Sequence, residues 1–195
     1  MKPLFSQEMG RGIRIMLLAA PSIFFAACAG DSDSFRPLAG NLICDNVMAG
    51  LGCMADGNTV EDYSGAPVLE PVSFINNTVS GNDFGLTGGA NLAAVNNIFA
   101  ETAQVAMKNL TVDSVAACNL FWNNTTDQED SILDPSESNI FGEDPLLDGE
   151  YALMPGSPAI DAGTASFTWL GDVMLDLPAS SYTGAAPDIG CAELF

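Results

Sequence analysis

The stretch Asn77-Thr78-Val79-Ser80-Gly81-Asn82 contains the pattern that decides the fold. An Asn is followed by two residues that are usually apolar or β-branched, and a second Asn closes the turn. The opening part recurs at intervals of 17 to 22 residues, and three of its six copies also carry the closing Asn. The copies begin at Asn41, Asn58, Asn77, Asn97, Asn119 and Asn139. A nearly constant period is typical of a solenoid with stacked coils.

Each repeat has room for three short strands, and the chain lacks the 3.6-residue periodicity of a helical repeat. We therefore expect an all-β fold, a short single-stranded right-handed parallel β-helix of about six coils over residues 41–147. The six leading asparagines are expected to form a structural ladder at one turn. Asn tolerates the left-handed conformation there, and its amide can bond to the Asn above and below. A role of one of them in ligand contact is the alternative.

The N-terminal segment has the features of a bacterial export signal. Lys2, Arg11 and Arg14 are followed by an apolar run and by Ala26-Ala27, which predicts a signal peptide over residues 1–27. Phe25-Ala26-Ala27-Cys28 resembles a lipobox, which implies cleavage before Cys28, acylation of that residue and a location at the outer membrane or cell surface. Residues 28–40 would then be the lipidated Cys and a polar tether. The alternative is a secreted protein in which Cys28 is incidental.

Residues 148–195 are expected to form an irregular C-terminal cap of the same domain. Asp161 and Asp188 each stand two positions before a glycine, Gly163 and Gly190. This spacing predicts that the carboxylates accept backbone N–H groups in Asx-type turns while the glycines take positive φ. Several prolines in the segment would end strand growth and protect the open edge of the solenoid.

Two strings in this segment resemble a known family. They are Gly156-Ser157-Pro158-Ala159-Ile160-Asp161-Ala162-Gly163-Thr164 and Pro187-Asp188-Ile189-Gly190-Cys191-Ala192-Glu193. With the repeated coils from Asn77 onward, the chain resembles the choice-of-anchor Q domain of bacterial surface and secreted right-handed β-helix proteins. The family often has an Arg before its last motif and an aromatic residue after the final Gly. Here residues 176–186 contain no Arg, and Cys191-Ala192 replaces the aromatic stretch.

The charge balance limits the possible functions. The chain has 5 Lys and Arg, 25 Asp and Glu and no His, giving a formal net charge of -20. Such a surface repels nucleic acid and acidic polysaccharide. After the predicted cleavage only Arg36 and Lys108 remain as cations, so a lyase would lack the positive charge that stabilises an enolate-like intermediate. We therefore expect no nucleic-acid partner and no lyase activity.

The first interpretation of function is a noncatalytic cell-surface lipoprotein, structural, adhesive or weakly glycan-binding through Trp122 or Trp169. Its partners would be the membrane, through the N-terminal lipid, and surface polysaccharide. The alternative is a polysaccharide-active enzyme, and a glycoside hydrolase that uses two carboxylates fits better than a lyase. Carboxylates near the repeat turns are numerous, but no pair recurs at one offset: Asp45, Asp56, Glu61, Asp62, Asp83 and Glu101. A truncated copy of a longer β-helix is a third reading.

No cofactor is expected, with one candidate for Ca²⁺. Asp127, Glu129 and Asp130 are placed in a loop between coils, where their oxygens could bind Ca²⁺, although an EF-hand spacing is missing. A solvated acidic loop is the competing interpretation. Besides Cys28, four cysteines could pair or stay free, and Cys44 with Cys53 is the nearest pair in sequence. The other two are Cys118 and Cys191.

Overall fold

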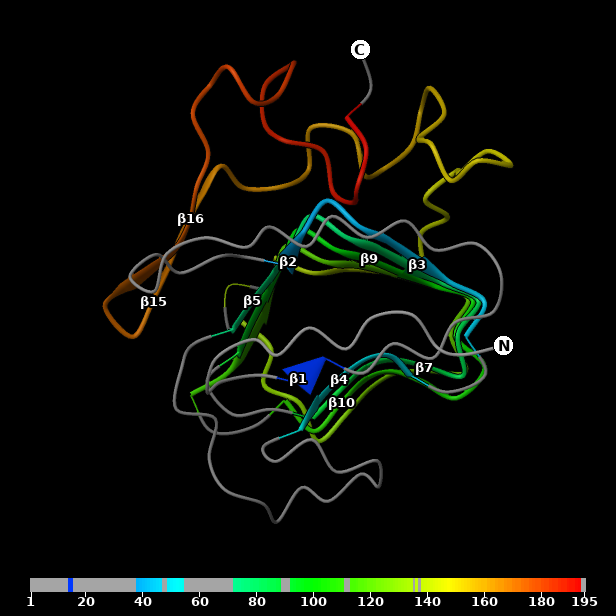
Figure 1. Cartoon of the computed structure of the whole chain (residues 1–195). Coiled ribbons are helices and arrows are strands. Elements are labelled where there is room, and N and C mark those ends of the chain that lie inside the picture. The colour runs from blue at the N-terminus through cyan, green and yellow to red at the C-terminus, as the bar shows by residue number, and fades with distance from the viewer. Residues whose placement is uncertain are drawn as a thin grey trace, which may run out of the picture.

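The computed structural model describes residues 14–15, 38–46, 49–54, 72–88, 92–110, 113–134, 136 and 138–193, and these contain strands and no helix. Three parallel sheets run along the molecule (Figure 1). We call them the first, second and third sheet in the order in which the chain passes through them. Within the part of the chain that is described, no helix has the length and apolar character of a membrane crossing.

The first sheet contains β2 (Leu38–Ala39), β5 (Val72–Ile75), β8 (Leu92–Val95) and β11 (Val115–Ala117). The second sheet contains β3 (Leu42–Cys44), β6 (Thr78–Ser80), β9 (Ile98–Ala100), β12 (Leu120–Trp122) and β14 (Ile140–Phe141). The third sheet contains β4 (Ala49–Met54), β7 (Phe84–Thr87), β10 (Val105–Lys108) and β13 (Thr126–Glu129), with β1 (Arg14–Ile15) antiparallel to β4. The predicted parallel β-helix is confirmed.

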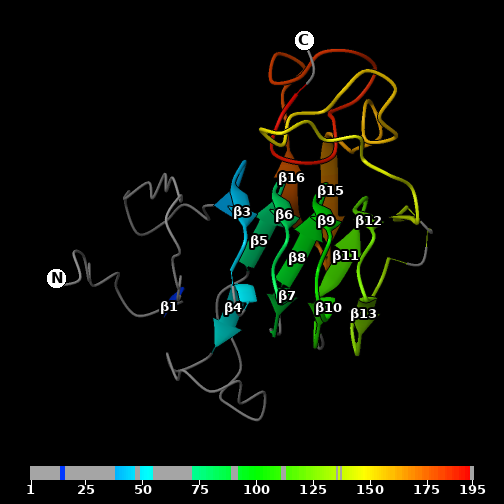
Figure 2. The same cartoon turned by 90° about the vertical axis from the view of Figure 1, so that its right-hand side faces the viewer.

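The described strands make four coils of three strands each, β2–β4, β5–β7, β8–β10 and β11–β13. A fifth coil begins with a bridge from Leu133 to Ala116 and continues to β14, without a described strand in the third sheet. The count is lower than the six expected because β3 pairs directly with β6, so that the first coil from Asn41 to Asn77 is 36 residues long. The stacked coils are seen from the side in Figure 2.

The interior of the coils is filled by apolar side chains from all three sheets. One column of the second sheet runs Val79, Phe99, Phe121 and Phe141 in register. Adjacent rings lie 5.2 Å apart for Phe99 and Phe121, and 4.9 Å apart for Phe121 and Phe141. Each fully buried Phe contributes about 2 kcal/mol or more through removal of its surface from water. This stack holds successive coils in register.

The C-terminal segment covers the outer faces of two sheets, rather than the end of the solenoid. The antiparallel hairpin of β15 (Ser166–Trp169) and β16 (Asp172–Asp176) packs Met174 and Leu175 against Ile75, Val95 and their neighbours on the first sheet. Leu153, Ala159 and Ile189 pack against the outer face of the second sheet. Figures 1 and 2 both place this segment beside the coils.

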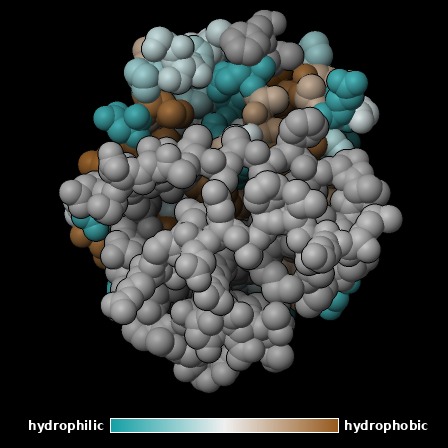
Figure 3. All heavy atoms as spheres, in the orientation of Figure 1, coloured by the Kyte–Doolittle hydropathy of each residue, from teal (hydrophilic) through white to brown (hydrophobic). Residues whose placement is uncertain are grey.

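The residues of the sheets explain this cover. All four residues of β8, Leu92-Ala93-Ala94-Val95, are buried, two facing the interior and two facing the hairpin. A strand buried on both faces reads as a continuous apolar run. The outside of the C-terminal segment, at the top of Figure 3, carries hydrophilic and hydrophobic residues next to one another.

Candidate functional site

The leading asparagines form a continuous hydrogen-bonded ladder along one corner. The backbone N–H and Nδ2 of Asn77 donate to Oδ1 of Asn97 at 2.9 and 3.0 Å. Nδ2 of Asn97 in turn donates to the Phe74 carbonyl at 2.9 Å. The same arrangement joins Asn41 to Asn77, Asn97 to Asn119 and Asn119 to Asn139. Asn58 lies outside the described residues, and the direct bond between Asn41 and Asn77 leaves no rung between them.

The left-handed conformation belongs to the residue that precedes the rungs Asn77, Asn97 and Asn119, which differs from our expectation. Asn76, Asn96 and Cys118 have φ of 52°, 57° and 53°, whereas none of the described ladder asparagines has positive φ. The reason is that the side chain of the rung must reach the backbone N–H of the preceding coil. The chain therefore turns one residue earlier.

The side chains at this turn also hold the C-terminal segment, a role that the sequence reasoning missed. Oδ1 of Asn96 accepts from the Thr164 N–H at 2.9 Å, and its Nδ2 donates to the Thr164 carbonyl at 2.9 Å. Its carbonyl accepts from the Gly190 N–H at 2.9 Å. The signal in the sequence was the doubled Asn at Asn76-Asn77 and Asn96-Asn97.

The closing asparagines form a second, interrupted ladder at the next corner. Asn46 donates through its backbone N–H and Nδ2 to Oδ1 of Asn82 at 3.0 and 2.7 Å. The following coil has Thr102 at this position, and the coil after it has Asn124, whose Oδ1 accepts from the Thr102 N–H at 3.0 Å. The residues before these rungs again take positive φ: Asp45, Gly81, Glu101 and Asn123.

Asp161 and Asp188 connect separate parts of the C-terminal segment through backbone N–H groups. Oδ1 of Asp161 accepts from the N–H of Ala185 at 2.6 Å and of Ala186 at 3.2 Å. Oδ1 of Asp188 accepts from the Asp161 N–H at 2.8 Å. The carboxylates thus accept backbone N–H groups, although the partners lie 24 to 27 residues away and not within a local Asx turn.

The two predicted glycines have different reasons for being glycine. Gly190 has φ of +108°, and a Cβ there would lie 2.7 Å from Cδ1 of Ile98. Gly163 does not have positive φ, contrary to expectation. A Cβ on Gly163 would lie 2.8 Å from the Pro187 carbonyl oxygen, so close approach of the backbone excludes a side chain.

Glu193 is a third carboxylate of this arrangement. Its Oε1 accepts from the Asp188 N–H at 2.9 Å and its Oε2 from the Thr183 N–H at 3.4 Å. The sequence motif contains Glu193 but gives no local signal for this role, because the loop that supplies Thr183 precedes it by ten residues.

Of the three acidic residues considered for Ca²⁺, two belong to a strand and the third directly follows it, so their assignment to a loop between coils is wrong. Asp127 and Glu129 are part of β13, and Asp130 follows it with φ of 50°. Oδ1 of Asp127 accepts from Nδ2 of Asn124 at 3.0 Å, and Glu129 forms an ion pair with Lys108 at 3.3 Å. Among the described residues no three His, Cys, Asp or Glu side chains are grouped to hold a metal ion.

The thiols of Cys44, Cys118 and Cys191 are free, so the pairing of Cys44 with Cys53 is not formed. Burial raises the pKa of the Cys44 thiol, and the Asp45 carboxylate raises it further. Burial also raises the pKa of Tyr151, which contacts Cys44. A raised pKa disfavours the thiolate, so Cys44 is a poor nucleophile. Cys28 lies outside the described residues.

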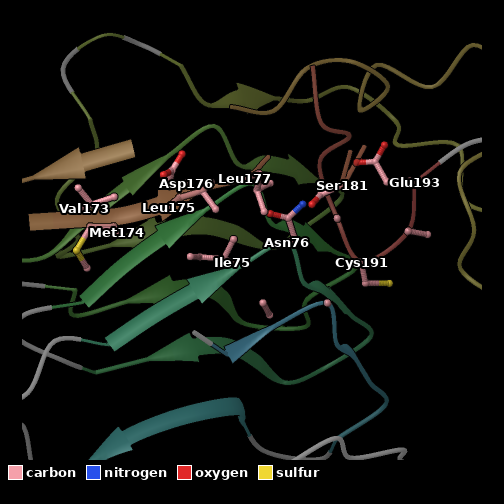
Figure 4. A pocket seen from close by; sticks show the side chains of 14 residues that line it. Ile75, Asn76, Val173, Met174, Leu175, Asp176, Leu177, Ser181, Cys191 and Glu193 are labelled. Atoms are coloured by element: carbon pink, nitrogen blue, oxygen red, sulfur yellow. The ribbon is translucent and has the colours of Figure 1, made fainter. Parts of the chain in front are cut away.

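A cavity of about 490 Å³ lies between the start of the first sheet, β16 and residues 190–193 (Figure 4). Its lining is mostly apolar and includes Ile75, Met174 and Leu177. Two carboxylates line it, Asp176 and Glu193, and Glu193 already accepts two backbone N–H groups. The cavity therefore does not present two unengaged carboxylates for acid–base hydrolysis.

Both tryptophans take part in packing. Trp122 lies half-buried against the cluster that joins the second sheet to the C-terminal segment. Trp169 packs on the first sheet, and its Nε1 donates to the Asp113 carbonyl at 2.9 Å. Neither indole is a freely exposed flat face for stacking on sugar rings.

No family model, curated protein or solved structure matches this chain.

Of the hydrolase candidates, Asp45 and Glu101 occupy the same corner two coils apart, separated by Gly81, and both raise the pKa of Tyr151 by their charge. Asp56, Glu61 and Asp62 lie outside the described residues.

Proposed function

We propose that the protein is a noncatalytic structural or adhesive module of the bacterial cell surface, tethered by a lipid on Cys28. The observation that carries the proposal is the use of its polar side chains. The buried asparagines bond between coils, and Asp161, Asp188 and Glu193 accept backbone N–H groups of the C-terminal segment. Side chains held in this way stabilise a rigid surface and are not available for proton transfer.

The resemblance to the choice-of-anchor Q domain supports the same role. Residues of its two strings hold the C-terminal segment against the coils, because Thr164 bonds to the Asn96 side chain and Gly190 donates to the Asn96 carbonyl. The anchor and the outer-membrane or cell-surface location rest on the lipobox-like Phe25-Ala26-Ala27-Cys28. Weak contact with neutral surface polysaccharide is part of the proposal, whereas the net charge of -20 disfavours acidic glycans.

The anchor is tested by expressing the full chain in a bacterium in the presence of a fatty-acid analogue. The wild-type protein should be labelled and sediment with membranes, and Cys28→Ser should lose both properties. Cys44→Ser is the matched control and should stay labelled. Labelling of Cys28→Ser equal to that of the wild type would disprove lipidation at this residue.

The noncatalytic role is tested by incubating the purified protein with neutral and acidic polysaccharides, with Ca²⁺ or with EDTA. Neither new reducing ends nor unsaturated products should form, and the melting temperature should not depend on Ca²⁺. Reducing ends without ultraviolet absorbance would establish a hydrolase. A melting temperature that rises with Ca²⁺ would indicate a metal site, with Asp127, Glu129 and Asp130 as the first residues to substitute.

A further inference from the structure

The two ends of the asparagine ladder are complementary. At inner rungs, the backbone N–H and Nδ2 of each Asn donate to Oδ1 of the Asn in the next coil. Asn139 is the last rung, and no further Asn among the described residues accepts from it. Asn41 is the first rung, and its Oδ1 accepts from no described residue. Nδ2 of Asn139 donates one hydrogen to the Ala116 carbonyl at 2.9 Å, as inner rungs do to the equivalent carbonyl. Within the described residues, the last rung thus retains donors and the first rung retains the matching acceptor.

The last coil also exposes apolar surface of the kind that the inner coils bury. Phe141 is 45% exposed and has Phe121 stacked on only one side, and Ile132 is 41% exposed. Ile140 and Leu133 are half-buried. At the opposite end, Leu42 and Leu38 are half-buried. Paired positions of the second sheet run from Leu42 in the first coil to Ile140 in the last. Paired positions of the first sheet run in the same way from Leu38 to Leu133. An edge strand presents unpaired backbone N–H and C=O groups, and exposed apolar side chains beside them favour pairing with a strand of another chain.

We propose that copies of this chain stack head to tail, with the last coil of one molecule on the first coil of the next. The Asn139 N–H and Nδ2 donate to Asn41 Oδ1 of the following copy, which extends the ladder in its own register. Ile140 lies beside Leu42 and covers part of the exposed apolar surface. A contact between two different ends is heterologous, so it produces linear series and not closed dimers.

Charge sets the conditions for this contact. Each copy carries a net charge of -20, and β13 adds Asp127 and Glu129 near the last coil. Repulsion between copies is strong at low ionic strength and is screened by salt. We assign the contact to the first and second sheets, because in the third sheet β1 already pairs with the outer edge of β4 in the first coil. We therefore expect weak association that increases with salt and concentration.

The test measures molar mass by light scattering after size-exclusion chromatography, over a range of protein and NaCl concentrations. All proteins carry Cys28→Ser, so that acyl chains cannot cause aggregation and the outcome does not depend on the anchor. In high salt the parent protein should show masses at multiples of the chain mass. Asn41→Ala removes the acceptor at the first coil, and Phe141→Lys places a charge at the last coil. Each variant alone should stay at the mass of one chain.

Mixing the two variants distinguishes head-to-tail stacking from other contacts. Asn41→Ala retains an intact last coil and Phe141→Lys an intact first coil, so the mixture should form species of twice the chain mass. Leu170→Lys, at a 65% exposed position on the β15–β16 turn, matches the charge change and should associate like the parent. Thermal unfolding checks that each variant is folded, and Ile132→Lys replaces Phe141→Lys if that variant is not.

Three results would overturn the proposal. The parent protein could stay at one chain mass at every salt and protein concentration. Asn41→Ala could associate as strongly as the parent, which would indicate that last coils meet each other. Finally, the mixture of the two folded variants could stay at one chain mass.

Discussion

Thr102 donates its backbone N–H to Oδ1 of Asn124 at 3.0 Å, while its own buried hydroxyl has no hydrogen-bond partner. Thr102 occupies the rung between Asn82 and Asn124 in the second ladder. Its side chain is too short to provide the amide that asparagines supply at this corner. The ladder is therefore interrupted at a position that is 1% exposed.

Thr102→Asn should stabilise the protein by restoring the missing rung. The new Oδ1 would accept from Asn82, and the new Nδ2 would donate toward the Val79 carbonyl, as Nδ2 of Asn82 donates to the Ile43 carbonyl at 3.0 Å. Each hydrogen bond of this kind makes a net contribution of about 1 kcal/mol to the free energy of unfolding. We expect a gain of about 1–2 kcal/mol in the free energy of unfolding, measured by urea denaturation. Thr102→Val removes only the unsatisfied hydroxyl and is the control. Equal stability of the two variants would contradict ladder repair.

The ladder was predictable where its period is regular. Asn77, Asn97, Asn119 and Asn139 follow one another at 20 to 22 residues, and all of them bond in series. The period fails in the first coil, because 36 residues separate Asn41 from Asn77 and 17 of them, residues 55–71, stand between β4 and β5. A prediction that assumes a fixed period therefore counts Asn58 as a rung of the ladder. The length of chain between two strands affects stability only weakly, so the period of the repeat does not report it.

The C-terminal segment was predictable in its residues but not in its partners. Asp161 and Asp188 accept backbone N–H groups, as expected of Asp before such turns, but the donors come from distant positions. Turn propensity reports local geometry only, so the lateral cover was missed. The better signal was β8, whose run of four apolar residues requires burial of both faces of the first sheet.

Asn97→Asp should destabilise the protein strongly. The amide Nδ2 of Asn97 donates to the Phe74 carbonyl and to Oδ1 of Asn119, both at 2.9 Å, and a carboxylate cannot replace these donors. A buried charge facing acceptor oxygens is costly, so we expect a loss of about 3 kcal/mol at neutral pH in urea denaturation.

The same change at the end of the ladder is the control. Asn139→Asp lies at a half-buried rung and should cost about 1 kcal/mol. Protonated Asp regains a donor, so the stability lost in Asn97→Asp should return as the pH falls and disappear again as it rises. A loss of equal size at both positions, or one that does not depend on pH, would contradict the ladder as the cause.

Gly85→Ala should disrupt the third sheet. A Cβ on Gly85 would collide with the carbonyl oxygen of Ala106 on the neighbouring strand β10, which is backbone and cannot move aside. We expect a loss of about 3 kcal/mol, with reduced soluble yield and a lower melting temperature. Gly149→Ala is the matched control, because nothing lies within 4 Å of its Cβ position. That variant should melt within a few degrees of the wild type, and equal stability of the two variants would disprove the close approach of β7 and β10.

Cys118 should make the protein less stable at alkaline pH. Burial raises the pKa of its thiol above the ordinary value of 9.0, and the Asp134 carboxylate raises it further, against the opposing effect of a hydrogen bond with Ser138. The native state therefore keeps the proton at a pH at which the unfolded chain has released it. This contribution to stability is fully present below pH 9.0 and is lost as the pH rises through the higher pKa of the folded state.

Cys118→Ser removes this titration while keeping a small polar side chain at the same turn. We expect the free energy of unfolding of the wild type to fall more steeply than that of the variant as the pH rises beyond 9.0. Cys44 and Tyr151, whose pKa values are also raised, titrate in both proteins and cancel in the comparison. Parallel curves for the two proteins would show that the thiol of Cys118 has the same pKa in the folded and unfolded chain. Alkylation at neutral pH gives an independent measurement, because a half-buried thiol that holds its proton should react with iodoacetamide more slowly in the native protein than in urea.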